Sequence, residues 1–81
     1  MSCLVLFKSI TYAQNALFHI NNNGIHAVII RKASNISGNG CGYCIKISES
    51  NLEKVYNILN EKKVNYISVW KNTGSEWVRI K

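Results

Sequence analysis

The stretch "CLVLFKSITYAQNALFHI", residues 3–20, joins the two patterns that decide the fold. Residues 3–8 are apolar and rich in residues that favour β-structure, which predicts a strand. Behind them, Thr11 and Gln14 have capping-box spacing, so we expect a helix to begin near Tyr12. The apolar residues then recur at helical spacing, which predicts one buried helix face made of Ala13, Ala16, Leu17 and Ile20.

The same order of patterns is repeated further along the chain. Residues 26–31 predict a second strand, residues 32–40 form a small polar loop, and residues 42–47 predict a third strand. Ser50 and Glu53 again have capping-box spacing. The apolar face of the helix expected to follow them consists of Leu52, Val55, Tyr56 and Leu59.

Residues 64–70 predict a fourth strand and complete the order β-α-β-β-α-β. This order is typical of the ferredoxin-like split βαββαβ sandwich, an α+β fold with a four-stranded antiparallel sheet and two helices on one face. Residues 1–71 would form this domain. Residues 72–81 would be a tail, in which Trp77, Val78 and Ile80 predict a short extra strand.

The expected sheet has exposed surfaces. We expect strands 26–31 and 64–70 to be its edges and the face without helices to be left open, because a chain of 81 residues is too short to cover it. A homodimer through the open face or an edge is the expected consequence.

Composition limits the function classes. The chain has 47% hydrophobic residues and no apolar run as long as a membrane span, so we expect one globular domain and no membrane association. Its N-terminus has no signal-peptide pattern, which predicts a cytoplasmic protein with reduced cysteines. The net charge is +6, but the lysines and arginines are spread along the chain, so nucleic-acid binding is not favoured.

The stretch "SGNGCGYC", residues 37–44, carries the chemistry. In the expected fold Cys41, between Gly40 and Gly42, follows the loop near the start of the first helix. A helix start favours a thiolate, as do neighbouring cations. The residues expected to support Cys41 there are Ser9, Thr11, Lys8, Arg31 and Lys32.

Cys44 raises a second question, because Cys-x-x-Cys also occurs in redox dithiols and metal sites. We expect Cys44 to lie inside the third strand, about 10 Å from Cys41 if the segment is extended. A disulfide requires Cα atoms within about 7 Å. A redox or soft-metal protein that uses Cys41 and Cys44 therefore stays the alternative, beside a non-catalytic protein-interaction module, and no resident metal or cofactor is expected.

Several of these segments together resemble one family. "LVLFKS", a Gly-Ile turn, a "VII" strand, the Gly-Cys-Gly loop and "NLEKVYNILNE" are similar to the small bacterial selenium/sulfur carrier-like proteins, over residues 3–70. The resemblance implies that Cys41 is the carrier thiol, which would hold sulfur as a persulfide or selenium as a selenosulfide. It also implies a donor protein such as a cysteine desulfurase. No general base or nucleotide-binding motif is recognised, so we expect a carrier or accessory protein rather than a stand-alone enzyme.

Overall fold

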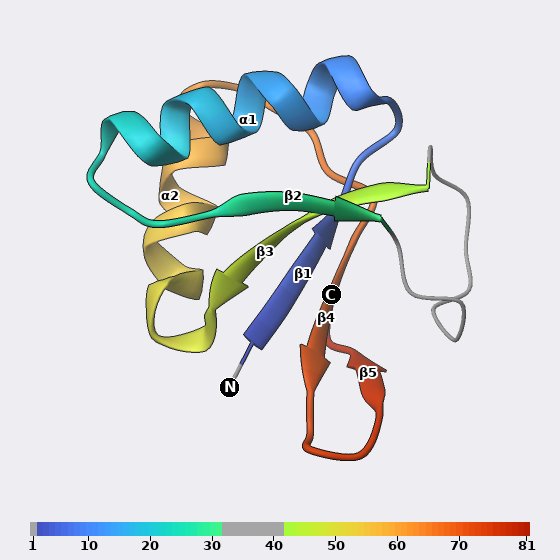
Figure 1. Ribbon diagram of the computed structural model, residues 1–81. Helices are drawn as coiled ribbons and strands as arrows, with labels where there is room; N and C mark the ends of the chain where they lie inside the picture. The colour runs from blue at the N-terminus through green and yellow to red at the C-terminus, as the bar shows by residue number, and fades with distance from the viewer. Residues whose placement is uncertain (1, 32–41) are drawn as a thin grey trace.

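The computed structural model describes residues 2–31 and 42–81 and has an α+β fold with one open, antiparallel sheet of five strands and two helices (Figure 1). The elements are β1 (Ser2–Leu6), α1 (Ile10–Asn22), β2 (Val28–Arg31), β3 (Tyr43–Ser48), a 3₁₀ turn (Glu49–Asn51), α2 (Leu52–Glu61), β4 (Ser68–Asn72) and β5 (Trp77–Arg79). No helix in the described part of the chain is both long and apolar enough to cross a membrane.

The strand order is β2-β3-β1-β4-β5. β3 lies between β2 and β1 and is antiparallel to both. β5 pairs with β4, with Lys71 opposite Val78, so the predicted short strand is present and extends the four-stranded sheet that we expected. β4 is therefore an interior strand, and the prediction that it forms an edge was wrong.

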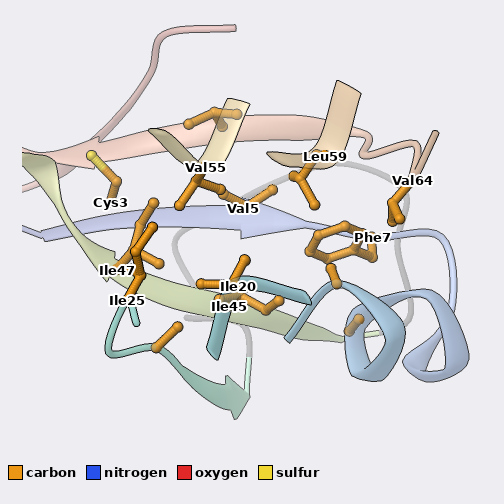
Figure 2. Packing of buried hydrophobic residues seen from close by; sticks show 14 residues of the cluster. Cys3, Val5, Phe7, Ile20, Ile25, Ile45, Ile47, Val55, Leu59 and Val64 are labelled. Carbon is orange, nitrogen blue, oxygen red and sulfur yellow. The ribbon is translucent and has the colours of Figure 1, made fainter. Parts of the chain in front are cut away.

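The main core lies between the sheet and both helices (Figure 2). Alternate residues of β1 and β3 face the helices because strand side chains alternate between the two faces. Val5 and Ile45 meet Ile20 of α1 and Val55 of α2 in this core, and all four side chains are essentially inaccessible to solvent. Burial of these apolar side chains holds the helices against the sheet.

The opposite face is less open than we predicted from chain length. Leu4, Leu6 and Cys44 point to this face and are fully buried. Partly buried side chains pack against these three residues: Ile30, Ile67, Trp70 and Trp77. This face therefore has an apolar cluster of its own, packed by the tryptophans of β4 and β5 and without a covering helix among the described elements.

Two helix starts also differ from the prediction. Ser9, in extended conformation, caps α1 and accepts a hydrogen bond from the Tyr12 backbone N–H, so Thr11 lies inside the first turn. The earlier start lets Ile10 pack against the core. Ser50 lies in the 3₁₀ turn before α2, where its hydroxyl is 3.0 Å from that of Ser48, and it does not cap the helix.

The two helices end in similar turns. Gly24 has a φ of +78° after α1, and the Ile25 N–H donates to the Ile20 carbonyl, as in a Schellman motif. After α2 the left-handed residue is Lys63, with a φ of +57°, and the Val64 N–H donates to the Leu59 carbonyl. Val64 therefore closes the helix end, which is why β4 begins at Ser68 and not at residue 64 as predicted.

Candidate functional site

The two chain ends that flank residues 32–41 are fixed to one another. Arg31, the last residue of β2, is the register partner of Tyr43, the first residue of β3. The Arg31 guanidinium donates a hydrogen bond of 3.4 Å to the Tyr43 hydroxyl and lies 5.4 Å from the centre of its ring. Gly42 enters β3 with a φ of +85°, a conformation that L-residues with a side chain adopt at a cost. The end of β2 and the start of β3 therefore lie side by side, and the Arg31 guanidinium lies at this point.

The start of α1 lies at the same end of the sheet (Figure 1). The register places Leu6, the last residue of β1, opposite Cys44, two residues after Gly42. From there the chain continues through the exposed Lys8 to the Ser9 cap. The first turn of α1 carries no acidic residue, so its N-terminal partial charge is not neutralised locally. This end of the domain is accordingly suited to a thiolate or another anion.

The structure brings together only part of the predicted site. Lys8, Ser9 and Thr11 at the start of α1 share one end of the sheet with Arg31 and Gly42. The predicted carrier thiol and its loop lie outside the described residues: Cys41, Gly40 and Lys32. The position of Cys41 relative to α1 therefore stays a prediction.

The other two cysteines are placed clearly. Cys3 in β1 and Cys44 in β3 have no exposed surface. They belong to separate apolar clusters on opposite faces of the sheet, Cys3 under the helices and Cys44 beside Leu4 and Leu6. Burial raises the pKa of the Cys3 thiol, and the nearby Glu49 carboxylate adds to this effect. Cys44 lies inside the third strand as expected, and both residues pack as small hydrophobic side chains.

Potential metal ligands do not gather in the part of the chain that the structure describes. No group of three or more His, Cys, Asp or Glu side chains is found there. His19 packs edge-on against the Phe18 ring, with 5.4 Å between the ring centres.

Two interactions near the cysteines were not foreseen. The first is the Arg31–Tyr43 contact. It follows from the pairing register between β2 and β3, which places the two residues opposite each other and which the sequence does not reveal. The second is the ion pair between Lys71 and Glu49, at 2.7 Å, close to the start of β1. It lowers the pKa of Glu49 and raises that of Lys71, chiefly through the hydrogen bond between them.

Comparison with known families adds to this geometry. Residues 2–71 match the family described as "Putative Se/S carrier protein-like". The chain belongs to this family. The resemblance seen in the sequence is thereby confirmed, and the match covers every described element except β5 and the last residue of β4, Asn72. No curated protein and no solved structure matches the chain.

Proposed function

We propose that this member of the selenium/sulfur carrier-like family holds the transferred atom on Cys41, as a persulfide or selenosulfide, in the reducing cytoplasm. The observation that carries the proposal is the complete burial of Cys3 and Cys44. The chain has three cysteines, and a carrier thiol must meet a donor protein and an acceptor in turn. Cys3 and Cys44 cannot meet such partners while they are buried, which leaves Cys41 as the candidate thiol.

The surroundings of the neighbouring chain favour a thiolate. Lys8 and Arg31 are exposed, and the α1 N-terminus, whose first turn carries no acidic residue, lies at the same end of the sheet. Cations and helix N-termini lower thiol pKa values. A thiol that is ionised near neutral pH attacks a sulfane sulfur faster than a buried thiol does.

The transfer step needs no external oxidant. The Cys41 thiolate attacks the terminal sulfur of a donor persulfide, a new S–S bond forms on Cys41, and the donor S–S bond breaks to leave a donor thiolate. Sulfane sulfur keeps its oxidation state throughout. An acceptor thiolate removes the terminal sulfur in the same way, and a terminal selenium is passed on by the same exchange.

The test is incubation with a cysteine desulfurase and free cysteine, followed by intact mass measurement under non-reducing conditions. The wild-type protein should gain the mass of one sulfur atom. A Cys41→Ser variant should gain none, and a variant with Cys3→Ala and Cys44→Ala should gain as much as wild type. Full sulfur uptake by Cys41→Ser would exclude the proposed role.

A soft-metal site made of Cys41 and Cys44 is less well supported, because Cys44 is buried against Leu4 and Leu6. Such a site would bind Cu(I) and lose it when either cysteine is replaced.

We also propose that β1–β4 form a ferredoxin-like unit and that the protein dimerises through β2. β2 pairs with β3 on one side, and no described strand pairs with its other side. Sedimentation at high protein concentration should detect the dimer, and a strict monomer would exclude it.

A further inference from the structure

A cleft of about 670 Å³ lies beside α2, and it has a size typical of small-molecule sites. Its walls come from three parts of the chain. These are the last two turns of α2, the connection from Lys63 to Tyr66, and Lys81 beyond β5. Lys81 lies outside residues 2–71, which match the family. The matched residues alone therefore do not form the complete cleft.

Positive charge dominates the cleft. Lys63 and Lys81 both line it, and no carboxylate side chain is found among the described residues of its walls. The nearest carboxylate in sequence, Glu61, forms an ion pair with Lys62 instead. A cleft with two ammonium groups and no acidic side chain attracts an anion.

Lys63 stands at a conformationally costly position. Its φ of +57° lies in the left-handed region, where the equivalent turn after α1 has Gly24. Glycine would fit this turn with less strain. Strained residues gather at functional sites, and here the strain places a cation at the cleft.

The remaining wall is aromatic and amidic. The rings of Tyr56 and Tyr66 are stacked with 6.0 Å between their centres, and the Lys81 ammonium lies 4.5 Å from the centre of the Tyr56 ring. A tyrosine phenol is protonated near neutral pH and can donate a hydrogen bond. Burial, and then the neighbouring Tyr66, raise the pKa of Tyr56 further. Three amide side chains complete the lining: Asn57, Asn60 and Asn65.

We propose that this cleft binds a small phosphate ester with a planar heterocycle, the chemistry of a mononucleotide. Lys63 and Lys81 hold the phosphate, because ammonium groups bind phosphate through charge-assisted hydrogen bonds. The tyrosine rings provide a flat surface for the heterocycle, and the asparagine amides offer both donors and acceptors to its edge. The site is independent of the Cys41 chemistry.

The experiment is an NMR titration of the full chain with AMP, adenosine and inorganic phosphate as separate probes. AMP should cause saturable shifts confined to residues 56–66 and 81, and it should bind more tightly than either partial probe. Loss of one phosphate contact should weaken AMP binding about tenfold in Lys63→Gly and in Lys81→Gln. Lys46→Gln is the matched control, because Lys46 is exposed on the sheet face opposite the helices.

Lys63→Gly also separates binding from folding, since it should keep or raise the melting temperature while AMP binding weakens. Four results would overturn the proposal: no saturable shifts at the cleft, phosphate binding as tight as AMP binding, wild-type affinity in both lysine variants, or an equal loss in Lys46→Gln. The last result would indicate nonspecific attraction to a basic protein.

Discussion

Cys3 and Cys44 should be almost unreactive in the folded protein. Both side chains have no exposed surface, and both lie in interior strands: β1 between β3 and β4, and β3 between β2 and β1. Cys3 is paired with Ile47 on one side and Lys71 on the other. Exposure of Cys3 requires the helices to leave the sheet, and exposure of Cys44 requires the apolar side chains packed around it to separate. We expect both events to accompany global unfolding.

The size of the protection follows from the stability of such a domain. At about 0.05 kcal/mol per residue, the low end for natural proteins, an 81-residue chain is stable by about 4 kcal/mol. The unfolded fraction is then about 10⁻³. Native alkylation of Cys3 and Cys44 should accordingly be about a thousandfold slower than alkylation of the unfolded chain.

The assay uses a Cys41→Ser variant, which leaves only the two buried thiols. Iodoacetamide is added at neutral pH with and without concentrated guanidinium chloride, and each site is followed by peptide mapping. Alkylation of Cys3 or Cys44 in the native protein at more than a tenth of its rate in the unfolded chain would contradict this burial. The argument that assigns the carrier role to Cys41 because Cys3 and Cys44 are buried would then be wrong.

Four further predictions concern stability. Gly42→Ala should cost about 1 kcal/mol in chemical denaturation, because φ is +85° while the added Cβ meets no atom within 4 Å. Lys63→Gly should be stabilising by up to about 1 kcal/mol in the same assay, since it relieves a left-handed side chain. Ser9→Ala should cost about 1 kcal/mol through loss of the α1 cap, seen as a lower melting temperature. Glu49 has a lowered pKa, so its contribution to folding stability is present above the ordinary pKa of 4.5 and is lost as pH falls through the lower pKa of the folded state. Glu49→Gln should therefore make the melting temperature depend less on pH over that acidic range. A pH dependence of the melting temperature equal to that of the wild type would contradict the ion pair.

Strand and helix order could be read from the sequence because apolar periodicity is a local signal. The helix faces through Ala16 and Val55 are placed as expected, since each depends on residues within a few turns of one helix. The short strand near Trp77 was also foreseen.

The differences arise where local signals compete or where packing decides. Ser9 and Thr11 are both good capping residues, and the helix starts at the one that lets Ile10 reach the core. Lys63 in a left-handed turn could not be expected from its type, because lysine has no preference for that conformation. Burial of Leu4 under the tryptophans depends on long-range strand pairing.

The functional residues divide in the same way. The interior position of Cys44 followed from the strand pattern, whereas the Arg31–Tyr43 contact depends on the register between β2 and β3. The placement of Cys41 beside Ser9 is still a prediction from topology.

The most direct test of the central claim is the location of the transferred atom after loading. The protein is incubated with a cysteine desulfurase and cysteine, its thiols and persulfides are alkylated without reduction, and the peptides that contain Cys3, Cys41 and Cys44 are quantified separately. The account predicts one additional sulfur on the Cys41 peptide and none on the other two. Sulfur on the Cys3 or Cys44 peptide, or an unloaded Cys41 peptide beside a fully active desulfurase, would contradict it.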